Sequence, residues 1–260
     1  MSIVRSAAQS TVLAAWSLTG FLLASPLFAQ GADPARPAPA PLTTEQRMLR
    51  DWASLARYRE ENARLAPPAK EEARVVFMGD SITDGWGRGT GTFFPGKPYV
   101  NRGISGQTTP QMLVRFRPDV IALKPKVVVI LAGINDIAQN TGPTTPEAIQ
   151  DNLMSMVDLA EANGIQVVLA SITPAYAFGW RPGLEPAGKI RAMNNWMRDY
   201  AERRGLVFLD YHSALTNGEG GFKAELSSDG VHPNEAGYAI MVPLAEKAIA
   251  QALAKPAPKR

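Results

Sequence analysis

Five short segments, most of them apolar, alternate along the chain with longer segments whose apolar residues recur every three or four positions. The short segments cover residues 74–78, 98–102, 126–131, 165–172 and 206–209. Most of them are nearly unbroken runs of branched apolar residues, a composition typical of strands that are buried on both faces of a parallel sheet. The pattern therefore predicts five parallel strands.

The longer segments carry the signals of amphipathic helices. A first helix is expected from Thr43 or Thr44 until Pro67-Pro68 ends it, with apolar and aromatic residues at helical spacing: Met48, Trp52, Leu55, Tyr58 and Leu65. Thr109 followed by Pro110 indicates the start of another. Further helices are expected over residues 146–163 and 186–204, and after residue 234. Because a parallel crossover needs a covering helix, the fold class is α/β, a doubly wound sandwich.

The N-terminal 29 residues differ from the rest of the chain. A single charge, Arg5, precedes an apolar stretch that ends in a small residue, Ala29, which is typical of a signal peptide. An uncleaved membrane anchor is the alternative, although polar residues interrupt the stretch. Export to a periplasm or out of the cell is therefore expected. Residues 30–42 are rich in Ala and Pro and indicate a linker, residues 43–254 form the folded domain, and residues 255–260 are expected to be a loose tail.

Composition excludes several classes of function. The formal net charge of the 260 residues is only +3, which does not suggest a nucleic-acid partner. The chain has no cysteine, so disulfides, thiolate metal sites and cysteine nucleophiles are excluded. A glycine-dense loop over residues 84–91 has neither of the glycine-rich phosphate-binding patterns.

Polar residues follow three of the predicted strands. Ser81 comes after the first strand in Gly-Asp-Ser, Gly106 after the second, and Asn135 after the third in Gly-Ile-Asn. The carboxyl ends of parallel strands meet at one edge of a sheet, where ligands of α/β proteins bind. A fourth pattern, Asp229-x-x-His232, lies near the C-terminus. A hydroxyl, an imidazole, a carboxylate and amide donors at one point would suit acyl transfer.

Each of these residues also has an ordinary structural interpretation. Gly-Asp-Ser and Asn-Asp are common in turns and helix caps. A serine nucleophile needs a base, and the chain has two histidines, His212 and His232. His232 is favoured because a carboxylate, Asp229, lies three residues before it. No G-x-S-x-G occurs, which excludes the nucleophile elbow of α/β-hydrolases.

Two aromatic loops are expected at the same edge of the sheet. Trp86 follows the first strand, and Tyr176 and Trp180 follow the fourth. These three residues are candidates for contact with substrate. For Trp86, burial in the core is an equally good interpretation.

Together, these motifs resemble those of the SGNH/GDSL hydrolases, a superfamily of serine esterases and lipases, between about Val75 and Ala250. Ile82 replaces the leucine of the GDSL name. The resemblance implies a flavodoxin-like three-layer α/β/α sandwich. It also implies that Ser81 is the nucleophile, His232 the base and Asp229 the residue that orients it. Ser81, Gly106 and Asn135 would form the oxyanion hole, with Gly106 preferred to Gly103, while Asp80 and Asp136 shape their turns.

The sequence from Asn101 to Thr109 is most similar to a compact branch that includes acetylhydrolases of platelet-activating factor and carbohydrate acetylesterases. The resemblance therefore implies hydrolysis of short acyl esters, on small molecules or glycans, without metal or organic cofactor. A lysophospholipase or thioesterase is the rival within the superfamily. A secreted binding module without turnover is the rival from another class. No stable insertion in a membrane is expected once a signal peptide is removed.

Overall fold

The computed structural model of the protein describes residues 43, 46 and 49–258. Its sheet consists of β1 (Val75–Gly79), β2 (Tyr99–Gly103), β3 (Val127–Leu131), β4 (Gln166–Ala170) and β5 (Val207–Leu209). All neighbouring strands are parallel, in the order β2-β1-β3-β4-β5. This confirms the predicted five-stranded parallel sheet, and the order is that of flavodoxin-like folds.

Helices occupy most of the chain between the strands and after β5. In chain order they are α2 (Arg59–Arg64), α3 (Ser81–Gly85), α4 (Thr109–Asp119), α5 (Ile134–Ile137), α6 (Pro146–Ala162), α7 (Pro186–Arg204), α8 (His212–Leu215) and α9 (Glu235–Leu253). Two short 3-10 helices are η1 (Ile121–Leu123) and η2 (Ala224–Leu226).

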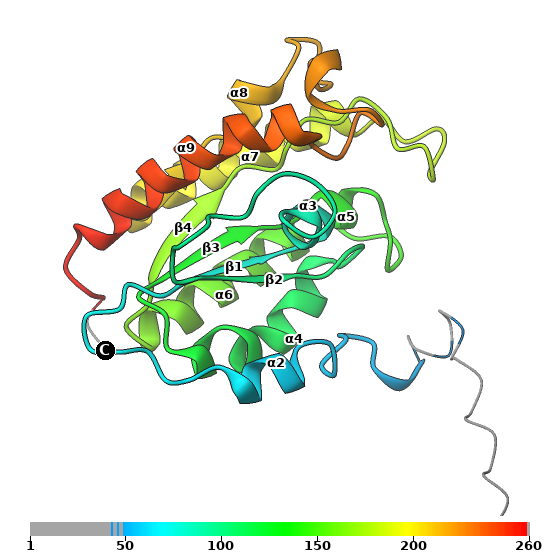
Figure 1. Ribbon diagram of the computed structural model, residues 1–260. Helices are drawn as coiled ribbons and strands as arrows, with labels where there is room; N and C mark the ends of the chain where they lie inside the picture. The colour runs from blue at the N-terminus through cyan, green and yellow to red at the C-terminus, as the bar shows by residue number, and fades with distance from the viewer. Residues whose placement is uncertain (1–42, 44–45, 47–48, 259–260) are drawn as a thin grey trace, which may run out of the picture. The chain divides into compact units, whose positions relative to one another are not determined.

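Successive side chains of β1 bury on opposite faces of the sheet. Val76 and Met78 belong to a core cluster with apolar residues of α4, α6 and α7, whereas Val75 and Phe77 belong to a second cluster with α9. Figure 1 shows α9 along one side of the sheet, with α4 and α6 on the other. This alternation follows from the two-residue period of a strand, and it produces three layers.

The ends of the three strands at the site are level with one another. Gly79 of β1 pairs with Gly103 of β2 and with Leu131 of β3. The loops that follow these strands therefore leave the sheet from one edge. The order of the strands reverses at β1, which is where open α/β sheets bind their ligands.

The prediction of one long N-terminal helix is wrong. Asp51 to Tyr58 form turns, and only α2 is helical between them and Pro67. The Asp51 carboxylate accepts hydrogen bonds from the N–H groups of Leu55 and Ala56, and Ser54 has a φ of 54°. The side chain of Asp51 thus competes with helical hydrogen bonding.

The two aromatic residues expected on that helix have different environments. Tyr58 is buried, as expected, and the guanidinium groups of Arg57 and Arg102 lie 4.7 and 4.6 Å from the centre of its ring. Trp52 is 41% exposed instead of packed in the core.

Two further boundaries differ from the prediction. The cap of α4 is Thr108 instead of Thr109, in a capping box with Gln111, because Thr109 uses its hydroxyl on Asp136. In the predicted loose tail, Lys255 Nζ donates to the Gly205 carbonyl at 2.6 Å, and Gln166 Nε2 donates to the Pro256 carbonyl at 2.5 Å. The first residues of the tail are therefore held against the domain.

The predicted signal peptide, residues 1–29, and the predicted linker, residues 30–42, lie outside the described residues. In the part of the chain that the structure describes, no helix combines the length and the apolar character needed to cross a bilayer.

Candidate active site

Ser81 lies at the first turn of α3, directly after β1. Asp80 is the cap of this helix, and its Oδ1 accepts a hydrogen bond from the Ile82 N–H at 3.0 Å. The turn is sharp enough that a Cβ on Gly79 would come within 2.1 Å of Thr83 Oγ1. Glycine is therefore required at residue 79, and the turn holds the Ser81 hydroxyl at the end of the strand.

The Ser81 hydroxyl is hydrogen-bonded to a histidine that lies 151 residues later in the chain. Ser81 Oγ and His232 Nε2 are 2.8 Å apart. His232 Nδ1 is 2.7 Å from Asp229 Oδ2. A proton on Nδ1, donated to the carboxylate, leaves Nε2 free to accept the proton of the serine. These three residues thus have the geometry that activates a serine hydroxyl.

Asp229 is held by its own turn as well as by the imidazole. Its Oδ1 accepts hydrogen bonds from the N–H groups of Val231 and His232, at 2.9 and 2.8 Å, and from the Ser227 hydroxyl. Desolvation raises the pKa of Asp229, but the hydrogen bonds from His232 and Val231 outweigh it and bring the pKa to about 2. Asp229 is therefore a carboxylate across the whole neutral range.

Gly106 lies in the loop after β2, and Asn135 lies in α5, the short helix after β3. Asn135 Nδ2 donates to the Gln107 carbonyl at 3.0 Å, and this bond joins the two segments. Within residues 49–258, the backbone N–H groups of Ser81 and Gly106 make no hydrogen bond. Asn135 uses one of its two Nδ2 protons on Gln107, which leaves the other available. Three donors are thus free in the loops that follow β1, β2 and β3.

Gly103 has a different role from Gly106. It ends β2, its carbonyl accepts the Tyr58 hydroxyl, and a Cβ there would lie 2.1 Å from the Asp84 nitrogen. Gly103 is thus required by close packing against α3. Gly106 has a φ of +78° in the loop beyond, where a Cβ would meet nothing closer than 3.9 Å. Its glycine is required by backbone conformation instead.

Three other titratable residues near these motifs do not belong to the hydrogen-bonded chain from Ser81 to Asp229. His212 begins α8, and its buried Nε2 has no hydrogen-bond partner among the described residues. Burial lowers the pKa of His212. Asp136 accepts the backbone N–H and the hydroxyl of Thr109, at the start of α4. Burial raises the pKa of Asp80, whose Oδ2 is also without a partner in the described chain, to about 7.

The aromatic candidates divide into buried and exposed residues. Trp86 is only 2% exposed and packs against Phe77, Phe94 and Tyr238, so its interpretation as a substrate contact is wrong and the core alternative holds. Tyr176 and Trp180 are 69% and 46% exposed. The Trp180 ring lies 6.4 Å from the ring of His232, so an exposed aromatic surface borders the imidazole.

Arg115, which none of the sequence motifs indicates, lies beneath the site and is fully buried. Its guanidinium donates to the carbonyls of Gly79 and Arg102, to Gln107 Oε1 and to Asp119. It therefore joins the ends of β1 and β2 to the loop of Gly106. The available signal was its spacing with Met112, Phe116 and Asp119, which places a charge on the buried face of α4.

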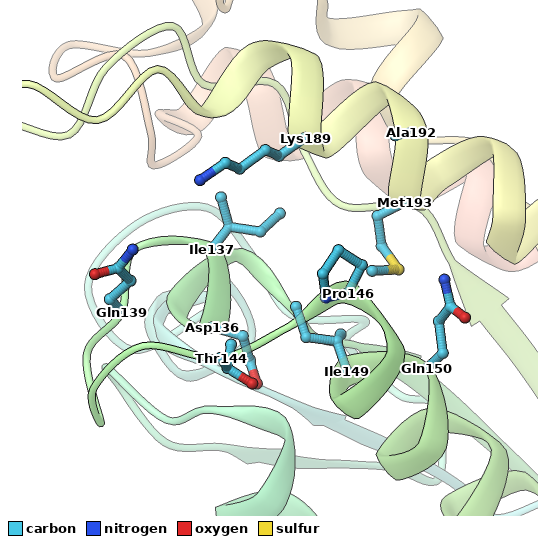
Figure 2. Close-up of a pocket in the computed structure, with 10 residues that line it drawn as sticks. All are labelled: Asp136, Ile137, Gln139, Thr144, Pro146, Ile149, Gln150, Lys189, Ala192 and Met193. Atoms are coloured by element: carbon cyan, nitrogen blue, oxygen red, sulfur yellow. The ribbon is translucent and has the colours of Figure 1, made fainter.

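A cavity of about 210 Å³ lies on another side of α5. Figure 2 shows it between α5 and the first turns of α6 and α7, with the Lys189 side chain extending along one side. Ser81, Asp229 and His232 are not among the residues that line it, so an ester bound there would not meet the hydroxyl. Among the described residues, no three His, Cys, Asp or Glu side chains are grouped to hold a metal ion.

Comparison with known proteins gives three matches of interest. An acetylxylan esterase from Geobacillus stearothermophilus is 30% identical over 204 residues, which are 65% of this chain and 90% of that enzyme. Esterase TesA from Pseudomonas aeruginosa is 32% identical over 138 residues, 52% of this chain and 60% of that one. A GDSL-like lipase from Bacteroides thetaiotaomicron is 44% identical in sequence, and its crystal structure matches this one with a TM-score of 0.75. The match covers 77% of this chain and 99% of the lipase chain.

The match to a protein family covers the same region as the site. The family model of the GDSL-like lipase/acylhydrolase family matches residues 77–240, from β1 into α9. This range includes every residue of the hydrogen-bonded chain from Ser81 to Asp229. The protein therefore belongs to the GDSL-like lipase/acylhydrolase family and is an ester hydrolase of that family.

Proposed function

We propose that this protein is an exported serine esterase that removes short acyl groups, acetyl above all, from carbohydrate esters through an acyl-Ser81 intermediate. The observation that carries the proposal is the hydrogen-bonded chain from Ser81 Oγ through the His232 imidazole to Asp229. Its two contacts, 2.8 and 2.7 Å, lie within the range required of a nucleophile, its base and the group that orients the base.

In the first half of the reaction, Ser81 Oγ attacks the ester carbonyl carbon while its proton moves to His232 Nε2. The carbonyl oxygen becomes an oxyanion and accepts hydrogen bonds from the N–H groups of Ser81 and Gly106 and from Asn135 Nδ2. The C–O bond to the alcohol then breaks, and His232 Nε2 donates its proton to the leaving oxygen. Asp229 stabilises the imidazolium between these two steps.

In the second half, water attacks the acyl carbon and gives a proton to His232 Nε2. The bond between the acyl carbon and Ser81 Oγ breaks, and Oγ takes the proton back from the imidazolium. The carboxylic acid leaves, and the enzyme returns to its starting state without any cofactor. The same three donors hold the oxyanion in both halves, so their stabilisation acts twice in each cycle.

The preference for carbohydrate esters rests on the surface beside His232. Tyr176 and Trp180 are the large exposed aromatic side chains of the loop between β4 and α7. Flat aromatic faces suit the apolar faces of sugar rings. Similarity to an acetylxylan esterase supports the same substrate class.

Export rests on the N-terminal sequence. Arg5, the apolar stretch that follows it and the small residue Ala29 have the arrangement of a signal peptide. Expression of the full chain followed by mass spectrometry of the mature N-terminus tests this part. A product that begins near Gln30 supports export, and one that keeps Met1 contradicts it.

The substrate proposal is tested with a series of p-nitrophenyl esters from acetate to palmitate, with acetylated xylan and with lysophospholipids. Acetate is expected to give the highest kcat/KM, and acetate should be released from acetylated xylan. The Ser81→Ala variant, which lacks the nucleophile, should be inactive on all of them. Activity that rises with chain length, with xylan untouched, would instead favour the lysophospholipase or thioesterase alternative.

A further inference from the structure

Asn140, in the loop that connects α5 with α6, contacts three separate parts of the site. Its Nδ2 donates to Asn135 Oδ1 at 2.8 Å and to the Gly106 carbonyl at 3.2 Å. Its Oδ1 accepts from Trp180 Nε1 at 3.2 Å. The backbone N–H of Asn140 also donates to the Asn135 carbonyl at 3.0 Å. One half-buried side-chain amide thus joins Asn135, the loop of Gly106 and the loop that carries Trp180.

The contact with Asn135 determines which end of that amide faces which neighbour. Asn140 Nδ2 can only donate, so it holds Oδ1 of Asn135 on its own side. The Asn135 Nδ2 group then lies on the opposite side, where one proton bonds the Gln107 carbonyl. The second proton remains for the oxyanion. Without Asn140, the Asn135 amide loses one of its two side-chain anchors.

The contact with Gly106 acts on the neighbouring donor. Gly106 has a φ of +78° and no side chain to restrict its backbone. Asn140 binds its carbonyl and thereby limits rotation of this loop. The Gly106 N–H belongs to the preceding peptide unit of the same loop, so a single side chain contacts the segments that carry two of the three donors.

The contact with Trp180 extends the arrangement to the aromatic surface. A second hydrogen bond runs beside it, from Arg181 Nη2 to the Gln139 carbonyl at 3.2 Å. The loop that carries Trp180 is thus attached to the loop that carries Asn140.

We propose that Asn140 is a positioning residue, which fixes the Asn135 amide and the Gly106 loop in the orientation that receives the oxyanion. The inference rests on the proposed oxyanion role of those two residues. Because oxyanion donors act in the transition state, loss of Asn140 should lower kcat and leave KM nearly unchanged.

Two variants of Asn140 and one control test the proposal. Asn140→Ala removes all three contacts and should lower kcat roughly tenfold on p-nitrophenyl acetate. Asn140→Asp keeps the size of the side chain and the acceptor for Trp180. However, its carboxylate repels Asn135 Oδ1 and attracts Asn135 Nδ2, so kcat should fall about a hundredfold. The control is Thr141→Val, which removes a hydrogen bond from the next residue of the loop to the Thr108 hydroxyl. Its kcat should stay within about twofold of wild type.

The order of the effects separates positioning from simple structural support. If Asn140 only filled space, Asp would be tolerated better than Ala, and that order overturns the proposal. It is also overturned if Asn140→Ala has the kcat of Thr141→Val while Asn135→Ala is slow, a result that leaves the proposed oxyanion hole intact. If Asn135→Ala itself keeps wild-type turnover, the oxyanion role fails first. Thermal unfolding of each variant shows whether lower turnover reflects lost fold.

Discussion

Replacement of Asp229 by asparagine tests how His232 becomes a base. In the wild type, Asp229 Oδ1 accepts two backbone N–H groups and the Ser227 hydroxyl, and Oδ2 accepts His232 Nδ1. In Asp229→Asn, the amide oxygen should stay at the position of Oδ1, because three donors converge there. The amide NH₂ group then faces Nδ1. Two donors cannot face each other, so the imidazole is expected to move its proton to Nε2.

That change of tautomer removes the acceptor from the Ser81 side of the ring. His232 Nε2, which lies 2.8 Å from Ser81 Oγ, would then carry a proton and could not take another from the hydroxyl. The equivalent substitution in the triad of a trypsin-type protease lowers kcat by roughly 10⁴-fold with the geometry intact. This corresponds to about 5.4 kcal/mol of activation free energy, at about 1.36 kcal/mol for each factor of ten. We expect a loss of that size here.

Kinetics and nitrogen NMR together measure the effect. The chain has only two histidines, so the ring-nitrogen spectrum can be assigned with a His212→Ala variant. The matched control is Asp210→Asn, which changes the carboxylate that caps the turn of the other histidine through the N–H and hydroxyl of Ser213. The control should keep wild-type kcat. A kcat for Asp229→Asn within tenfold of wild type, or a lost kcat with the Nδ1-protonated tautomer retained, would contradict this role of Asp229.

Three further predictions follow from the site and the residues beneath it. Asn135→Ala should fold but lose about 10²–10³ in kcat, since one oxyanion donor is removed; turnover within a few-fold of wild type would reject that role. Burial raises the pKa of Asp80 from 3.8 to about 7, so the folded protein keeps this proton as pH rises through a range where the unfolded chain loses it. Stability should therefore fall between about pH 4 and pH 7, by up to roughly 4 kcal/mol for this group; urea titrations should show a flatter profile for Asp80→Asn, and parallel profiles would contradict the burial effect. Arg115→Met should lower the free energy of unfolding by roughly 3–5 kcal/mol, because Asp119 stays buried without its cationic partner; an unfolding midpoint in urea that does not change would contradict this expectation.

The sheet could be predicted because its strands have an unambiguous pattern. Residues 127–131 are apolar throughout and buried on both faces, as only a central parallel strand would be. The interruption of the N-terminal helix could not be predicted, because it depends on the side chain of a single residue. The spacing of Trp52, Leu55 and Tyr58 is helical, yet the Asp51 carboxylate accepts local N–H groups and ends the helical path.

Some residues of the site could likewise be predicted from the sequence, and others could not. Ser81, Asn135 and the Asp229-x-x-His232 pattern stand directly after strands or in short motifs, where few arrangements are available. Trp86 could not be placed, because an aromatic residue in a glycine-rich loop can turn toward the core or the solvent, and here Phe77, Phe94 and Tyr238 provide a core for it. Asn140 belongs to no recognisable sequence motif. It could not be identified from the sequence because its contacts are with three segments that meet only in the folded chain.

In the proposed mechanism, His232 activates Ser81 for attack on an acyl carbon. Labelling with a fluorophosphonate probe, followed by peptide mass spectrometry, tests it most directly. One adduct is expected, on the peptide that contains Ser81, formed rapidly in the wild type and in His212→Ala and lost in Ser81→Ala and His232→Ala. An adduct on another residue, or undiminished labelling of Ser81 in the His232→Ala variant, would contradict it.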